Sequence, residues 1–227
     1  MNLELNEVLA RNKDSFGLVI GLDYRNERTV VFDLSEDNKK LSKIDLGNPQ
    51  EFENYLLEIL KRQDAEIGIG KYAEDRTIYK HSKLFGKERT VHLGVDLWVK
   101  AGIPVFAPLN GKVHSFADNN QDGDYGPTII IEHTLEGCEF YTLYGHLSRN
   151  SLQCLQKGKE VKKGQLIGYI GNYPENGNWP PHLHFEIITD MLGREGDFFG
   201  VASQDEQGYY LNLCPNPNLI LGISVLD

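Results

Sequence analysis

No stretch of this sequence is apolar over the ~20 residues that a membrane-spanning helix needs. Lysine and arginine form no cluster, and a formal charge of −10 argues against a surface that neutralises nucleic-acid phosphates. The opening MNLELNEVLARNKD lacks the basic start and continuous apolar stretch of a signal peptide. We therefore expect a cytoplasmic protein that has neither a membrane nor nucleic acid as its partner.

Cysteine is scarce, and one common metalloprotease motif is missing. Cys138, Cys154 and Cys214 are odd in number and show no CxxC spacing, which predicts reduced thiols and neither disulfides nor a thiolate metal site. The chain has no HExxH motif, so it offers no glutamate base of that kind. Any metal chemistry must therefore depend on other residues.

The pattern of apolar residues changes near residue 75, which predicts two domains, 1–75 and 76–227. In the first domain, residues 16–23 and 29–34 are typical of two strands joined by a polar turn. Asn48 is a candidate N-cap for a helix that starts at Pro49 and repeats apolar residues with helical spacing. We interpret residues 1–75 as a small α/β appendage without chemistry of its own.

Beyond Arg89 the chain consists of short β-prone segments separated by glycine, proline and asparagine. They cover residues 91–99, 104–109, 112–117, 128–133, 139–147, 165–172 and 182–188. This spacing predicts a mainly β protein with an antiparallel β-sandwich or barrel-like core and no long helix.

Three motifs in this region gather metal ligands and proton carriers. HLGVD contains His92 and Asp96, YGHL contains His146, and PPHLHFE contains His182 and His184. Together they hold four of the seven histidines. Two imidazole ligands, one carboxylate ligand and two spare imidazoles are the inventory of a catalytic zinc centre with an open coordination position.

Backbone geometry adds to this interpretation. In a strand, His182 and His184 leave the same face, so one imidazole can coordinate a metal while the other handles protons. Four extended residues span ~13 Å, so the chain must bend if His92 and Asp96 are to share one metal ion. Gly94 is the residue that can bend there without a Cβ clash.

Other polar residues have simpler explanations. We interpret His81, His114 and His133 as hydrogen-bonded structural histidines. Residues 118–123 match the first half of a calcium-binding loop, but the twelfth position is Ile129, where a bidentate glutamate is required. A polar turn between two strands accounts for this segment.

HLGVD, YGHLS and PHLHFE, in this order, resemble the zinc metallopeptidases of the lysostaphin type. The segments GIPVFAPLNGKV and GKEVKKGQLIGYIGN are also similar, and the resemblance runs from about Thr90 to Ile188. It implies a β-sandwich core with a groove across a Zn²⁺ ion. By motif position, it implies that the zinc ligands are His92, Asp96 and His184, and that the free catalytic histidines are His146 and His182.

The implied reaction is hydrolysis of a peptide bond or a related amide by a metal-activated water. The sequence does not divide the proton work between the two free histidines, and Glu186 is either a partner of the site or a solvated strand carboxylate. The alternative function is a non-catalytic zinc-containing or peptide-binding module on the same scaffold that regulates another enzyme. A phosphocarrier domain with paired histidines would leave Asp96 unexplained.

The sequence departs from the family in ways that bear on substrate. Typical members have a loop rich in glycine, serine and threonine before the paired histidines, whereas NYPENGNWPP stands here, so we expect a stiffer and more apolar groove rim around Trp179. Typical members are exported to cut cell-wall peptides, and no export signal is visible. Residues 186–201 and 213–222 resemble a cytosolic subgroup fused to kinase-like and aminotransferase-like domains, which favours a small peptide or amide as substrate.

Overall fold

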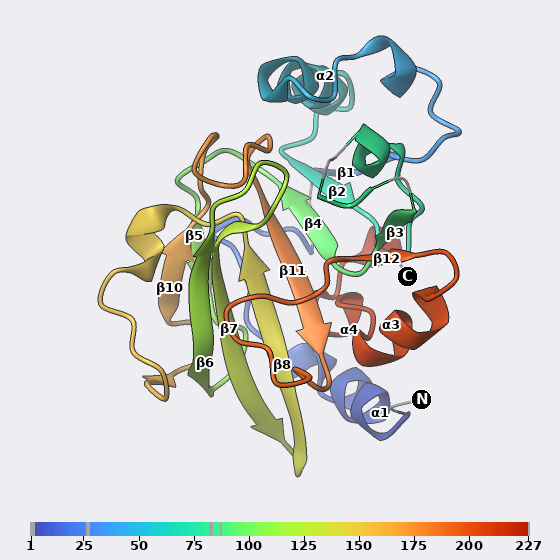
Figure 1. The fold of residues 1–227 in the computed structure, drawn as a ribbon. Helices are drawn as coiled ribbons and strands as arrows, with labels where there is room; N and C mark the ends of the chain where they lie inside the picture. Colours follow the sequence, from blue (N-terminus) through green and yellow to red (C-terminus); the bar gives the residue numbers. More distant parts are fainter. Residues whose placement is uncertain (1–2, 26–27, 82–83, 87, 227) are drawn as a thin grey trace.

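The computed structural model describes residues 3–25, 28–81, 84–86 and 88–226. Its central feature is an eight-stranded sheet in the order β1-β2-β4-β11-β8-β7-β6-β9 (Figure 1). The strands of this sheet are β1 (Thr29–Phe32), β2 (Ile67–Gly70), β4 (Val95–Trp98), β6 (Gly111–Asn119), β7 (Gly126–Leu135), β8 (Cys138–Gly145), β9 (Glu160–Val161) and β11 (His182–Ile188). All its pairings are antiparallel except that between β1 and β2, so the sheet is mixed.

The described part of the chain also contains two strand pairs, four α-helices and five short 3₁₀ helices. The pairs are β5 (Pro104–Phe106) with β10 (Leu166–Tyr169), and β3 (Arg89–His92) with β12 (Val201–Ser203). The helices are α1 (Leu3–Arg11), α2 (Pro49–Arg62), α3 (Gln207–Leu213) and α4 (Asn218–Leu221). Over the described residues, no helix combines the length and apolar character needed to cross a membrane. The mainly β fold is confirmed, and helices after residue 89 are short.

The predicted pair of strands at 16–23 and 29–34 is wrong. Only the second run forms a strand, and its partner is β2, a strand that the apolar pattern did not predict. Residues 16–23 instead run along β5, with Ile20 making an isolated bridge to Val105. Their apolar side chains are buried in the main core or pack against it, but the segment makes only this bridge and does not pair with residues 29–34, so apolar content alone misled the prediction. Residues 26–27 of the predicted turn lie outside the described residues.

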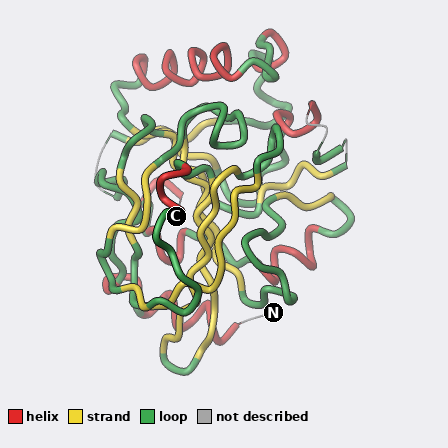
Figure 2. Tube along the Cα trace, turned by 60° about the vertical axis from the view of Figure 1, so that its left-hand side comes forward, coloured by secondary structure: helices red, strands yellow, loops and turns green. Residues whose placement is uncertain are grey.

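Helix α2 forms as predicted. The Asn48 side chain accepts hydrogen bonds from the backbone N–H groups of Gln50 and Glu51, which caps the first turn. On its inner face Phe52 packs edge-on against Trp98, with ring centroids 5.7 Å apart. Figures 1 and 2 show α2 at one end of the molecule, beyond the edge strand β1 and its neighbour β2. It covers a satellite core and contributes no side chain to the chemistry described below.

The N-terminal region continues the sheet of the C-terminal region. Strand β2 pairs with β4 from Gly68↔Trp98 to Gly70↔Asp96, and β1 extends the sheet by one more strand. The domain boundary near residue 75 stays a prediction, but a continuous hydrogen-bonded ladder now joins the regions on both sides of it. Residues just before 75 are therefore in place to contact the motifs.

The two faces of β11 have different environments. Leu183, Phe185 and Ile187 point into the main hydrophobic core, which lies between the large sheet and the β5–β10 pair. His182 and His184 alternate with them and therefore share the opposite face, as strand geometry predicts. This face carries the candidate site.

Candidate metal centre

Strand register brings two of the predicted ligands together. His184 on β11 lies directly opposite Asp96 on β4, and the flanking positions in the same row across the sheet are Gly70 and Gly145. Directly opposed side chains on one face of an antiparallel pair are close neighbours. The row therefore places a carboxylate beside an imidazole, with a glycine on either side.

His92 joins this pair through the predicted bend. It ends β3, and β4 begins three residues later, so the chain turns between His92 and Asp96. Gly94 is needed here for space and not for an unusual backbone angle. A Cβ at Gly94 would lie 2.5 Å from Cε1 and 2.6 Å from Nε2 of His184, closer than real Cβ contacts allow.

The three residues converge on one point. His92 Nε2 lies 3.0 Å from His184 Nδ1, and each of these atoms lies 3.2 Å from Asp96 Oδ1. One potential ligand atom from each residue lies within 4.8 Å of the others, and all three side chains are buried. Two imidazole nitrogens and one carboxylate oxygen suit a zinc ion with an open coordination position.

The outer atoms of the ligands are also engaged, which fixes their orientation. His92 Nδ1 donates to the Lys71 carbonyl at 2.8 Å, so Nε2 carries the free lone pair. His184 Nε2 lies 3.2 Å from Glu186 Oε2, which leaves Nδ1 as the nitrogen that faces Asp96 and His92. Glu186 is fully buried and accepts a hydrogen bond from Tyr125. Of the two interpretations of Glu186, the structure therefore supports a partner of the site and excludes a solvated strand carboxylate. Such outer partners orient metal-binding histidines.

The other two motif histidines lie beside the cluster. The His146 and His182 rings are 4.1 Å apart, and His182 stacks on Trp98 at 3.9 Å. Nδ1 of His146 donates to the Asn176 carbonyl and Nδ1 of His182 to the Pro180 carbonyl, each at 2.8 Å. Both Nε2 atoms are therefore free to accept protons. The structure thus brings together all five predicted site residues.

His146 is held in an unfavourable backbone conformation. Its φ of 60° lies in the left-handed region, which non-glycine residues rarely adopt. The backbone is fixed there because the His146 N–H donates to the Tyr125 carbonyl and the His146 carbonyl accepts from Gly171. Such strain persists where the surroundings over-determine it, and it is often found at functional sites.

Burial keeps three of the histidines neutral at pH 7. It lowers the pKa of His92 to about 3, with a further contribution from the charge of Arg76, and lowers that of His182 to about 4. Burial also places the pKa of His146 well below its ordinary value. Neutral imidazole is the form that binds metal or accepts a proton.

His184 and Asp96 differ from these three histidines, because their surroundings favour the charged form of each side chain. Burial opposes the charge on both groups, but hydrogen bonds to Asp96 and Glu186 outweigh it and raise the pKa of His184 to about 9. The neighbouring His92 and Arg76 likewise outweigh burial and hold the pKa of Asp96 well below its usual range. The carboxylate is therefore ionised and ready to bind a cation.

Residues 90–195 match the family model of peptidase family M23. This part of the chain, called the M23 segment below, contains all five predicted site residues and covers just under half of the sequence. The match confirms the resemblance carried by the three motifs. The match ends within residues 186–201 and before residues 213–222, the two segments that resemble the cytosolic subgroup, so membership of that subgroup stays a prediction.

Relatives with known names match over the same region. The chain is 39% identical over 96 residues to an uncharacterized metalloprotease of Haemophilus influenzae, covering 42% of this chain and 18% of that protein. It is 34% identical over 98 residues to the peptidoglycan DD-endopeptidase ShyA of Vibrio cholerae, covering 43% and 20%. The aligned region thus spans about a fifth of each curated relative. The catalytic domain of lysostaphin from Staphylococcus simulans aligns with a TM-score of 0.38 and 27% identity, over 53% of this chain and 80% of that domain.

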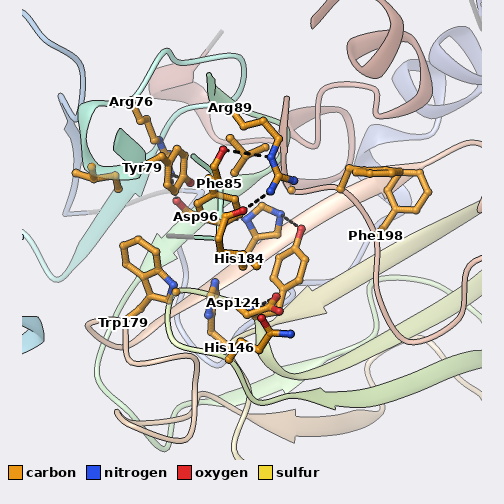
Figure 3. Close-up of a pocket in the computed structure, with 18 of the residues that line it drawn as sticks. Arg76, Tyr79, Phe85, Arg89, Asp96, Asp124, His146, Trp179, His184 and Phe198 are labelled. Atoms are coloured by element: carbon orange, nitrogen blue, oxygen red, sulfur yellow. Dashed lines mark hydrogen bonds and ion pairs between the residues drawn. The ribbon is translucent and has the colours of Figure 1, made fainter. Parts of the chain in front are cut away.

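The cluster opens into a pocket of about 260 Å³. In Figure 3, Asp96 and His184 lie between Trp179 on one side and Phe198 on the other. Trp179 packs edge-on against Tyr79 at 6.1 Å, and Tyr79 packs against Phe85 at 5.2 Å. These three residues form an aromatic wall, in agreement with the apolar rim predicted around Trp179. The ionisable residues Asp124, Arg194 and Asp197 also line the pocket.

Sequence reasoning missed residues that lie outside the M23 segment. Arg76 bonds to Asp96, Lys71 bonds to His92, and Tyr79 lines the pocket. None belongs to a motif with a recognised metal spacing. The only available signal was their position just before the first motif.

The other histidines and the acidic turn behave as expected where they are described. His133 is buried and bonds to the Asn110 carbonyl and the Thr142 hydroxyl, while His114 bonds to Ser115. The side chain of His81 lies outside the described part of the structure. Residues 120–125 form the turn between β6 and β7, where Asp118 pairs with Arg149 at 2.8 Å.

Proposed function

We propose that this chain is a zinc-dependent hydrolase of peptide bonds or related amides. The observation that carries the proposal is the convergence of His92, Asp96 and His184 within 4.8 Å of one another, with two further histidines beside them. A non-catalytic module, even one that contains zinc, would not need two free imidazoles beside its ligand set. The presence of both free imidazoles beside the ligands favours catalysis over binding alone.

The donor set fits zinc. His92 through Nε2, Asp96 through Oδ1 and His184 through Nδ1 would hold the ion, since these atoms converge and their outer neighbours are already bonded. Zinc held in this way supplies Lewis acidity and a nucleophilic water near neutral pH. The protein must then manage protons and orient the substrate.

His146 and His182 are suited to this proton work. Because each donates through Nδ1 to a backbone carbonyl, Nε2 is the unprotonated nitrogen that can accept a proton from the attacking water. The same atom can return that proton to the leaving amine when the C–N bond breaks, and the intervening imidazolium can stabilise the oxyanion. Burial keeps both rings unprotonated at pH 7, so each Nε2 retains the lone pair that accepts the proton.

For the substrate we propose a peptide or a small amide. Relatives are named as a peptidoglycan DD-endopeptidase and a glycyl-glycine endopeptidase, which supports peptide chemistry in general. The aromatic wall of Tyr79, Phe85 and Trp179 favours a substrate with apolar groups near the scissile bond over a chain of glycines.

We also propose a cytoplasmic location and membership of the cytosolic subgroup fused to kinase-like and aminotransferase-like domains. The similarity of residues 186–201 and 213–222 to that subgroup supports this. The three cysteines are all free thiols, as in proteins of a reducing compartment. Fractionation of the native cells, followed by detection of the protein, tests the location.

The test of the proposed activity is hydrolysis before and after chelation. Glycine-rich peptides, D-amino-acid peptides and acylated small amines are incubated with the purified protein. Cleavage of at least one class should stop when a chelator removes the metal and return when zinc is added. Cleavage that continues undiminished without metal would contradict the proposal.

A further inference from the structure

Arg76 is fully buried behind the metal centre. Its side chain lies between two carboxylates, those of Asp96 and Glu74, which are also buried. Arginine is almost never fully buried unless it is paired, because removing its charge from water is costly. The position of this residue therefore requires an explanation beyond packing.

The guanidinium contacts one particular oxygen of the ligand carboxylate. Nη1 of Arg76 donates to Asp96 Oδ2 at 2.5 Å, whereas Asp96 Oδ1 is the atom that faces His92 and His184. We propose that Arg76 is a positioning residue that fixes the rotation of the Asp96 carboxylate and so presents Oδ1 to the metal. This inference rests on the proposed zinc-dependent function.

Arg76 is itself held by several groups. Its Nε donates to Glu74 Oε2 at 3.0 Å, and Nη1 also donates to the Tyr79 hydroxyl at 2.9 Å. Nη2 donates to the Lys71 carbonyl at 3.2 Å. A planar guanidinium with donors at fixed angles can satisfy these acceptors together, which a lysine ammonium cannot do with the same geometry.

The segment that carries Arg76 is anchored to β3. Ala73 N–H donates to the His92 carbonyl, His92 N–H donates to the Glu74 carbonyl, and Arg76 N–H donates to the Thr90 carbonyl. The Lys71 carbonyl also accepts from His92 Nδ1. Residues 71–76 therefore hold two of the three ligands from outside the M23 segment.

Gly70 leaves the space that this contact requires. It lies opposite Asp96 in the sheet, and a Cβ there would come within 2.5 Å of Arg76 Nη2 and 2.8 Å of Asp96 Oδ2. The row across the sheet thus admits the guanidinium beside the ligand. A side chain at this position would have to displace it.

Arg76 and Glu74 carry opposite charges, so removing both tests the orientation of the Asp96 carboxylate separately from electrostatic effects on the metal ion. A lone positive charge near the site would repel a divalent cation, but Glu74 lies 3.0 Å from Arg76 and opposes that effect. Removing both groups changes the local charge little, whereas it removes the hydrogen bond to Asp96. The double variant Arg76→Met/Glu74→Gln therefore isolates orientation.

The experiment measures zinc affinity by chelator competition and the visible absorption spectrum of the Co²⁺-loaded protein. In the double variant we expect zinc affinity to fall about 10- to 100-fold, as for other partners of metal ligands, and the Co²⁺ bands to shift. Arg25→Met is the matched control, because Arg25 binds backbone carbonyls of Phe16 and Leu221 far from the cluster. It should lower stability without changing zinc affinity.

Arg76→Lys keeps the charge and tests the same role if the double variant does not fold. Its zinc affinity should lie below that of the wild type, since one ammonium cannot reproduce the hydrogen bonds that the guanidinium donates at fixed angles. Wild-type affinity in the folded double variant, or in Arg76→Lys, would overturn the role of Arg76. A wild-type protein that binds no zinc would instead contradict the proposed function itself.

Discussion

The M23 segment and residues 67–79 contribute to the same centre in different ways. The M23 segment supplies the three proposed metal ligands, together with both free histidines. Residues 67–79, called the flanking segment, supply the Arg76 guanidinium and the Lys71 carbonyl behind the ligands. The difference shows that reactive groups and the groups that orient them can lie in separate parts of a sequence.

The largest expected effect comes from removing a ligand supplied by the M23 segment. In His92→Ala, the Nε2 ligand is lost, so zinc content should fall to near zero and hydrolysis to the background rate. His114→Ala is the control, because this half-buried histidine lies outside the cluster. Zinc content and turnover are measured together. Full activity in His92→Ala would show that the ligand set is wrong.

Removal of a free histidine should separate proton transfer from metal binding. His146→Ala and His182→Ala should each retain zinc but lower kcat by about 10² to 10⁴, the usual contribution of general acid–base catalysis. Single-turnover rates and zinc content of the same samples are the measurements. Loss of zinc in both variants would indicate that His146 and His182 are metal ligands or structural supports, and would contradict their role in proton transfer.

The motifs predicted the M23 segment well because their residue types are specific. His182 and His184 were correctly placed on one face by strand alternation, and the bend at Gly94 was expected from distance. The sequence explained only part of the need for Gly94, because the close approach of the His184 ring depends on the three-dimensional structure.

The flanking segment was not predictable in the same way. A backbone carbonyl such as that of Lys71 leaves no trace in the residue type, and one arginine before a motif has no diagnostic spacing. Strand β2 contains two glycines and is too short to show a period, so its pairing with β4 was missed. Long-range contacts determine all of these features.

Both segments also build the aromatic wall, and this predicts a smaller effect on substrate choice. Trp179→Ala should lower kcat/KM about tenfold for peptides with apolar side chains near the scissile bond, since it removes buried contact area. Glycine peptides should be affected less. Tyr209→Ala, at an exposed ring that does not line the pocket, serves as control. Equal losses of kcat/KM for apolar peptides and glycine peptides would contradict the proposed selectivity.

The smallest effect on zinc binding and hydrolysis is expected at a histidine of the M23 segment that lies outside the cluster and affects folding stability instead. Burial lowers the pKa of His133 to about 4, from an ordinary value of 6.5. Between these values the unfolded chain binds a proton that the folded protein does not, so the free energy of unfolding falls as the pH drops from about 6.5 to 4. The expected contribution is on the order of 2–3 kcal/mol.

His133→Gln should reduce this pH dependence. Urea unfolding of wild type and variant at pH 7 and pH 4.5 measures the difference. The wild type should lose more stability than the variant over this interval. Identical losses would mean that His133 is not held neutral by the fold.

The most direct test of the central claim compares two histidines that lie two residues apart on β11. His184 is assigned as a metal ligand and His182 as a free proton carrier, although both are buried on one strand face. Zinc per protein chain is measured after purification and dialysis. We predict one zinc in the wild type and in His182→Ala, and none in His184→Ala. Equal zinc content in the two variants would contradict this division.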